Sequence, residues 1–147
     1  MIRFKCSSDE EFIHSTWITN LHSAKPYSFT PWNIFCTNQN DIIDNLQPIS
    51  NTLIYCIAED PNLILGYLCY SHLQDNLIVH FGYVKEKFRN NKIMSELLYN
   101  ADHNYKNKLI TLTHATKMYV SLSKKFTTTF DPYIINKLQI LNEELND

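Results

Sequence analysis

A short polar loop in the middle of the chain carries the residue types that bind an anionic group. It follows an apolar run that ends at Val84 and leads into a run whose apolar residues recur at helical spacing. The first amides of such a helix have no internal acceptor and lie at the positive end of its dipole, where a phosphate group is stabilised. Arg89 and Lys92 add positive charge, and Asn90 and Asn91 tolerate the positive φ that a phosphate-cradling turn requires. The loop is therefore predicted to bind phosphate.

The elements expected to hold this loop are a strand over residues 77–85 and a helix over residues 87–105. Two further strands are expected at residues 51–58 and 63–73, and turn-forming residues separate each pair. All three strands are apolar at both alternating sets of positions. This pattern indicates an antiparallel meander that is covered by helices on both faces.

The third of these strands contains Gly82, one of two glycines in the chain. A glycine inside a strand often marks a bulge or a close approach by another backbone, and the alternative is that a bulky neighbouring side chain fills the space. Strict alternation along the strand places His80 on the same face as Gly82 and Val84, and it places Phe81 and Tyr83 on the other face.

The N-terminal third is expected to contain a first strand and two helices. Ser8 and Glu11 fit a capping box, and apolar residues then follow at every fourth position. Residues 23–40 show no clear period and are expected to form a loop with a short helical turn after Pro31. Asn40 is the expected N-cap of the second helix.

The C-terminal third predicts a strand at 109–114, a helix at 115–124, a β-rich run at 126–130 and a final helix. Antiparallel strands followed by a β-α-β crossover indicate a mixed sheet. The predicted fold class is α/β, with a single domain over residues 1–147 and a mixed, mostly antiparallel sheet with helices on both faces. The final helix carries an apolar stripe that packs either within the chain or at a dimer interface, formed by Ile134, Leu138, Leu141 and Leu145.

Composition excludes several classes of protein. Of 147 residues, 44% are hydrophobic and 19% charged, which is typical of a globular domain. The formal net charge of −2 argues against non-specific nucleic-acid binding. No apolar run is long enough to cross a membrane, and the N-terminus does not resemble a signal peptide. The four cysteines show no metal-ligand spacing, so no metal site is predicted.

The loop and its flanking elements resemble the acyl-CoA site of the GNAT N-acyltransferase superfamily. Members carry a strand that ends in valine, an aromatic residue, the pattern Arg/Gln-x-x-Gly-x-Gly/Ala, and a helix with paired leucines. This chain matches at Val84, Phe88, Arg89 and Leu97-Leu98, and the order of its elements also resembles the GNAT fold. Three segments further resemble small GNAT-like proteins of tailed bacteriophages, namely residues 79–85, 113–116 and 131–133.

The resemblance implies that acetyl-CoA is the co-substrate and that its acetyl group is moved to an amine acceptor. The loop amides would hold the CoA pyrophosphate, and the strand backbone would pair with the pantetheine arm. The implied location is the cytoplasm, which would be the host cytoplasm for a phage protein, or else the virion. The implied cofactor-binding residues are Tyr83, Val84, Arg89, Asn90, Asn91, Lys92, Ile93 and Met94.

Transfer of an acetyl group to an amine needs a base for the amine proton and an acid for the departing thiolate. His80 is the first candidate base because the unperturbed pKa of imidazole lies near neutrality, and His114, at the end of the neighbouring strand, is the second. Tyr133 lies near the place where the family often provides a tyrosine acid. For each of these side chains, a purely structural packing role is the alternative.

Two positions depart from the family pattern. Lys92 and Met94 stand where the family has glycine and then glycine or alanine. Side chains at these positions crowd the approach of the backbone to a pyrophosphate. An alternative function is therefore a catalytically inactive GNAT-fold protein that acts as a binding or virion-associated structural component, as a homodimer or in a phage assembly.

Overall fold

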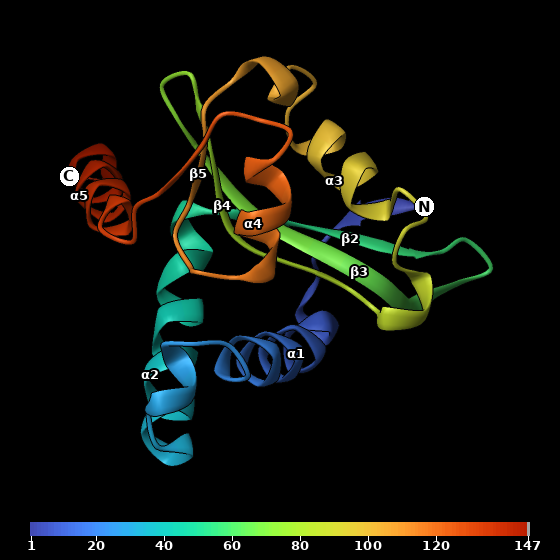
Figure 1. Ribbon diagram of the computed structural model, residues 1–147, viewed down its shortest axis with the longest axis horizontal. Helices are drawn as coiled ribbons and strands as arrows, with labels where there is room; N and C mark the ends of the chain where they lie inside the picture. Colours follow the sequence, from blue (N-terminus) through green and yellow to red (C-terminus); the bar gives the residue numbers. More distant parts are fainter. Residues whose placement is uncertain (147) are drawn as a thin grey trace.

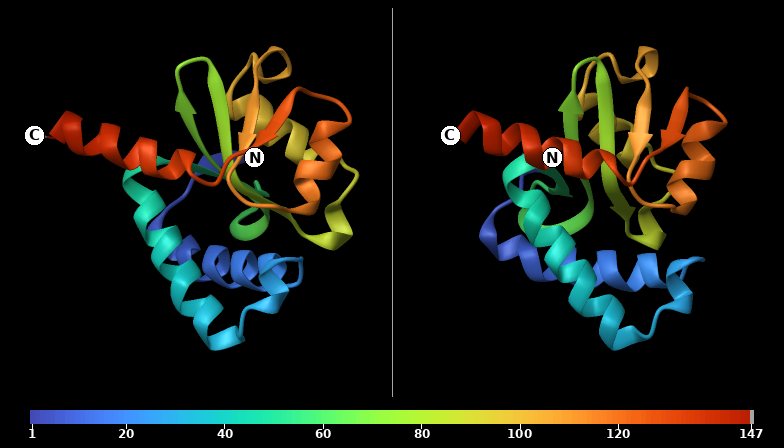
Figure 2. Two further views of the ribbon diagram at one scale, coloured as in Figure 1. Left: turned by 60° about the vertical axis from the view of Figure 1, so that its left-hand side comes forward. Right: turned by 90° about the vertical axis from the view of Figure 1, so that its left-hand side faces the viewer.

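A computed structural model describes residues 1–146, which form a six-stranded sheet between two layers of helices (Figures 1 and 2). The strands lie in the sheet in the order in which they occur in the chain. The first four pair in antiparallel fashion, and the last two run parallel to the fourth, which confirms the predicted mixed, mostly antiparallel sheet. The strands are β1 (Ile2–Phe4), β2 (Asn51–Ile57), β3 (Asp60–Leu73), β4 (Asn76–Val84), β5 (Ile110–Leu112) and β6 (Thr128–Phe130).

Helices cover both faces of the sheet, as the doubly apolar strands predict. One face carries α1 (Glu10–His22), α2 (Trp32–Leu46) and α5 (Ile134–Asn146), and the other carries α3 (Ile93–Ala101) and α4 (Lys117–Ser123). The side chains of β3 divide between the two layers. Tyr67 and Cys69 pack in the core beneath α1 and α2, whereas Leu68 and Tyr70 pack in the core beneath α3 and α4. No helix within residues 1–146 is long and apolar enough to span a membrane.

The start of α1 depends on Asp9 and not on the predicted capping box at Ser8. The Asp9 side chain, only 3% exposed, accepts hydrogen bonds from both terminal nitrogens of Arg3 at 2.7 and 2.9 Å and from the backbone amide of Cys6 at 2.9 Å. These hydrogen bonds lower the pKa of Asp9 to about 2, and those from Arg3 contribute most. The predicted serine cap does not form, and a buried carboxylate instead ties β1 to the 3-10 turn (Ser7–Asp9) that leads into α1.

The helix α2 is longer than the sequence predicts. It begins at Trp32, directly after Pro31, whereas the irregular composition of this region predicts a loop as far as Asn40. The reason is tertiary packing, because the ring of Phe35 is 3% exposed and lies 4.8 Å from the ring of His22, measured between centroids. Asn40 lies inside the helix, and its side-chain oxygen pairs with Nδ1 of His14 at 2.7 Å.

Candidate active site

A β-bulge at His80 determines how the centre of β4 presents its side chains. Phe81 pairs with Cys69 of β3 and Val79 pairs with Tyr70, so His80 is the extra residue. The bulge turns His80 toward the α1 and α2 face, where Phe81 also packs. The predicted alternation, which placed His80 on the face of Gly82, is therefore wrong because a bulge changes the alternation of side chains.

Beyond the bulge, β4 and β5 separate and a cleft opens between them. The two strands pair only at Leu77, Ile78 and Val79 of β4 within the described part of the chain. The remainder of β4, from Phe81 to Val84, lines a cleft of about 800 Å³. The beginnings of α3 and α4 border the same cleft, and the end of α1 lies at one of its sides. A ligand in this cleft would have access to the backbone groups of β4 that point away from β3, which no strand pairs with there.

The loop that leads into α3 is built around two left-handed residues. A short 3-10 helix spans Glu86–Phe88, and Asn90 and Lys92 then adopt φ values of 68° and 63° before α3 begins. The predicted helix from residue 87 to 105 is therefore wrong at both ends. Asn90 has the expected positive φ, but Asn91 does not, and Lys92 adopts one instead.

The cleft is lined by positive charge. The side chains of Arg89 and four lysines border it, and no aspartate or glutamate lies among its lining residues. This contrasts with the net charge of −2 for the whole chain. A concave surface with charges of one sign attracts ligands of the opposite sign, so the cleft favours a polyanion. The four lysines are Lys92, Lys106, Lys117 and Lys125.

Two methionines meet over Gly82 inside the cleft. A Cβ atom at Gly82 would lie 2.9 Å from Sδ of Met118 and 2.9 Å from Cε of Met94. Met94 belongs to the first turn of α3 and Met118 to the first turn of α4, so their thioether groups lie across the cleft from opposite sides. The space over Gly82 is therefore filled by flexible side chains and not by another backbone, which is the alternative interpretation of this glycine.

The hydrogen bonds around the bulge define the protonation of both histidines. The Ser71 hydroxyl donates to the Ile49 carbonyl at 2.7 Å, so its oxygen accepts from Nε2 of His80 at 2.8 Å. Nδ1 of neutral His80 then accepts from the Thr113 hydroxyl at 3.1 Å. Nδ1 of His114 donates to the backbone oxygen of His80 at 2.9 Å, since a carbonyl can only accept. The lone pair of neutral His114 is therefore on Nε2.

The two imidazoles differ in whether they have a ring nitrogen without a hydrogen-bond partner. Both nitrogens of His80 are hydrogen-bonded, and the residue is 1% exposed. Nε2 of His114 makes no hydrogen bond within residues 1–146 and, unlike the indole nitrogen of Trp17, is not sealed from solvent. Burial lowers the pKa of His80 to about 3, with a further contribution from His114, and it lowers the pKa of His114 to about 4. Both rings are therefore neutral at pH 7.

The structure brings most of the predicted cofactor-binding residues together and separates the predicted catalytic ones from them. His80 and His114 lie buried behind the cleft, and Tyr133, 75% exposed at the start of α5, does not border it. Asn91 also lies outside the lining. Sequence reasoning missed Met118 and Lys117 of α4 and Lys125 just after it, because this segment meets the loop only in space. The predicted residues that line the cleft are Tyr83, Val84, Arg89, Asn90, Lys92, Ile93 and Met94.

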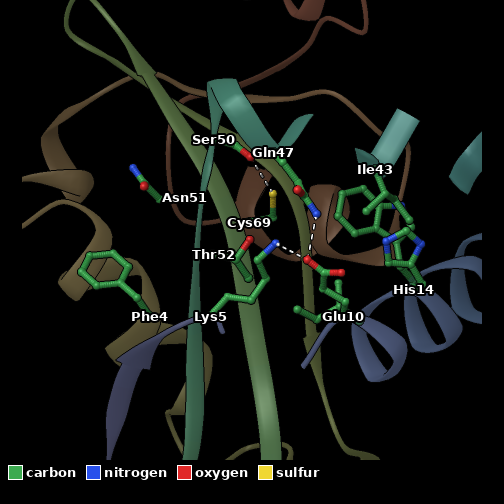
Figure 3. Close-up of a pocket in the computed structure, with 12 residues that line it drawn as sticks. Phe4, Lys5, Glu10, His14, Ile43, Gln47, Ser50, Asn51, Thr52 and Cys69 are labelled. Carbon is green, nitrogen blue, oxygen red and sulfur yellow. Dashed lines mark hydrogen bonds and ion pairs between the residues drawn. The ribbon is translucent and has the colours of Figure 1, made fainter. Parts of the chain in front are cut away.

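A second hollow of about 210 Å³ lies between α1, α2 and the start of β2 (Figure 3). Its charged groups are paired with one another. Glu10 Oε1 lies 3.8 Å from Nζ of Lys5 and accepts a hydrogen bond from Nε2 of Gln47 at 3.1 Å. The Cys69 thiol donates to the Ser50 hydroxyl at 3.5 Å. This hollow is therefore less suited to a charged ligand than the cleft beside β4.

The left-handed conformation of Lys92 leads to a prediction about stability. Replacing Lys92 by glycine should raise the free energy of unfolding by about 1 kcal/mol, because a residue with a Cβ atom is strained at positive φ. Chemical denaturation measures the change. Asn91→Gly is the matched control, since Asn91 has no positive φ. Equal stability of the two variants would contradict the assigned backbone conformation.

Comparison with known proteins supports the fold. No model of a known protein family and no curated protein matches the sequence. Among solved structures, a proposed acetyl transferase from Pyrococcus furiosus matches with a TM-score of 0.60 and 16% identity, over 76% of this chain and 80% of that one. A possible acetyltransferase from Clostridium difficile matches over 100% and 89% of the two chains, with a TM-score of 0.51 and 13% identity. An acetyltransferase from Vibrio fischeri matches over 76% and 93%, with a TM-score of 0.50 and 14% identity.

The chain therefore shares its fold with these solved structures. Identities of this size establish an architecture, and what this chain does must be argued from its own cleft.

Proposed function

We propose that this protein is an N-acyltransferase that moves an acetyl group from acetyl-CoA to an amine. The observation that carries the proposal is the cleft beside β4, which combines a strand edge that β5 leaves uncovered, the first amides of α3 and five cationic side chains without a carboxylate. CoA offers the matching chemistry, because it joins a phosphate-rich nucleotide to an arm that contains amide groups. The acetyltransferase neighbours with the same fold support the same class of reaction.

The proposed binding mode assigns the phosphates to the loop and the amide-containing arm to β4. Arg89, Lys92 and the amides at the start of α3 would hold the pyrophosphate. The Nε atom of Arg89 donates to the Val84 carbonyl at 2.9 Å, which holds the guanidinium beside the loop. The backbone of Gly82 and the amide of Val84, which point away from β3, would pair with the arm, because the backbone of Tyr83 faces β3 and the Val84 carbonyl accepts from Arg89. An amide of β4 near Tyr83 would polarise the thioester carbonyl.

For the proton transfer we assign His114 as the acceptor and His80 as its positioning residue. The amine nitrogen attacks the thioester carbonyl carbon and the C–S bond breaks. His114 does not border the cleft, so its Nε2 would take the proton that the amine loses through an intervening water and return it to the departing thiolate by the same route; protons and charges then balance. His80 has no free nitrogen, but its carbonyl fixes the tautomer of His114. Tyr133 remains the alternative acid for the thiolate.

Binding of CoA is tested by thermal unfolding with and without the ligand. At a CoA concentration of 100 times the Kd, the folded state gains about 2.7 kcal/mol, which raises the Tm by several degrees. Arg89→Ala should remove most of this shift. Lys87→Ala is the matched control, since Lys87 is exposed in the same loop and does not line the cleft. Pantetheine, which lacks the phosphates, should give a much smaller shift. No shift at millimolar CoA would contradict the proposal.

The second candidate function is a GNAT-fold binding or virion-associated component without catalysis. It is favoured by Met94 and Met118, which lie across the cleft over Gly82. An assay of thiol release from acetyl-CoA, run with a panel of amines, separates the two candidates. A CoA-induced thermal shift without thiol release for any amine would favour the non-catalytic function.

A further inference from the structure

The helix α5 carries an apolar stripe that only partly meets the body of the protein. Ile134 and Leu138 are 6% and 7% exposed and pack with Ile78 of β4. Leu141 and Leu145 continue the same stripe but are 41% and 85% exposed. Figure 2 shows why, because α5 runs outward and its C-terminal end lies clear of the sheet and the other helices.

A groove runs beside this uncovered half of α5. Its volume is about 530 Å³, and it lies between the helix, the turn that joins β3 to β4, and the edge formed by β5 and β6. Leu73 and Leu109 contribute to one wall, and Ile140 and Leu141 of α5 contribute to the other. Ile140 is 54% exposed. The groove is therefore open, largely apolar and continuous with the exposed stripe.

The sequence of α5 on this side is complementary to itself. Lys137, Ile140, Leu141 and Glu144 are spaced i, i+3, i+4 and i+7, which places them along one side of a helix. In an antiparallel pair of α5 helices, a two-fold axis can pass between Ile140 and Leu141. Ile140 of each copy then faces Leu141 of the other copy. The same axis sets Lys137 of each copy against Glu144 of the other. The same two-fold rotation therefore places apolar side chains against apolar side chains and each lysine against a glutamate.

We propose that the occupant of this groove is α5 of a second copy, in an antiparallel two-fold dimer. Charge complementarity identifies the occupant. Lys137 and Glu144 make no ion pair within the described residues, so each can pair with the opposite charge on a second copy. In one helix their separation along the axis is about 10 Å, which is too far for a contact. The interface is isologous, so each copy supplies both the groove and the helix that fills it, and assembly stops at two.

Sedimentation of the full chain over a range of concentrations tests the dimer. We expect a dimer that dissociates on dilution, and we expect Leu141→Asp to be monomeric at all concentrations. Leu63→Asp is the matched control, because Leu63 is 42% exposed on β3, away from the groove, and this variant should remain dimeric. Circular dichroism checks that each variant is folded. A wild-type monomer at every concentration, or a dimer that survives Leu141→Asp, would overturn the proposal.

Charge reversal tests the antiparallel arrangement. Lys137→Glu and Glu144→Lys should each weaken the dimer roughly tenfold, because each places like charges together twice across the two-fold axis. The double variant should restore the wild-type dissociation constant. A double variant that is as weak as either single variant would refute the pairing of Lys137 with Glu144.

Discussion

Acidification from pH 7 to pH 4 should destabilise the folded protein by several kcal/mol. Burial holds the pKa of His80 near 3 and that of His114 near 4, whereas an unfolded histidine titrates near 6.5. Below pH 6.5 the unfolded state therefore binds protons that the folded state does not, and stability falls as the pH falls. Each histidine contributes up to about 1.4 kcal/mol per pH unit over this window.

Urea unfolding at a series of pH values measures this effect and assigns it to residues. In His80→Gln the slope between pH 6.5 and pH 4 should be about half that of the wild type, since one of the two groups is gone. His103→Gln, at an exposed histidine, should leave the slope unchanged. Protonation of Asp9 lowers the stability only at lower pH, because the pKa of its carboxyl group in the folded state is about 2. A flat profile from pH 7 to pH 4 would show that the two imidazoles are not buried as described.

Replacing His114 by glutamine should lower the kcat for acetyl transfer at least 100-fold, given the proposed function. Removal of a general base typically costs a factor of about 10² to 10⁴. The CoA-dependent rise in Tm should remain, because His114 does not line the cleft where CoA would lie. Steady-state kinetics together with thermal unfolding would separate loss of chemistry from loss of binding.

Two further variants make this test specific. His80→Gln should reduce kcat less than His114→Gln, because the backbone carbonyl that orients His114 is still present. His103→Gln should leave kcat unchanged. If His114→Gln retained wild-type activity, or if it abolished the CoA-dependent shift, the assigned role of His114 would be wrong.

Local patterns in the sequence were sufficient to predict the strands and the final helix. The strands β2, β3 and β4 follow from apolar runs between turn residues, and α5 follows from a stripe at helical spacing. The start of α2 does not follow from local pattern, since burial of Phe35 against α1 holds residues 32–40 in a helix. The turn before α1 is held by a bond between Asp9 and Arg3 of β1, which no local pattern indicates.

The candidate site was predictable where it depends on one continuous segment. Of the predicted cofactor-binding residues between Tyr83 and Met94, all except Asn91 line the cleft. The bulge at His80 was not predictable in position, because alternation gives no sign of an inserted residue. The assignment of His114 required the hydrogen bonds of Thr113 and the His80 carbonyl, which join β4 to the end of β5.

The order of the strands has a consequence for how the chain acquires its structure. Because spatial neighbours are also neighbours in the sequence, β2, β3 and β4 form a meander whose pairings close over short turns. Short loops lose little entropy on closure, so this meander suits the role of folding nucleus. The partner of β1 lies some 50 residues further along the chain, since Ile2 of β1 pairs with Tyr55 of β2. We expect β5 and β6 to join the sheet after α3 has packed, because α3 precedes both strands in the chain. The cleft beside β4 would then be completed late, where the meander meets the last two strands.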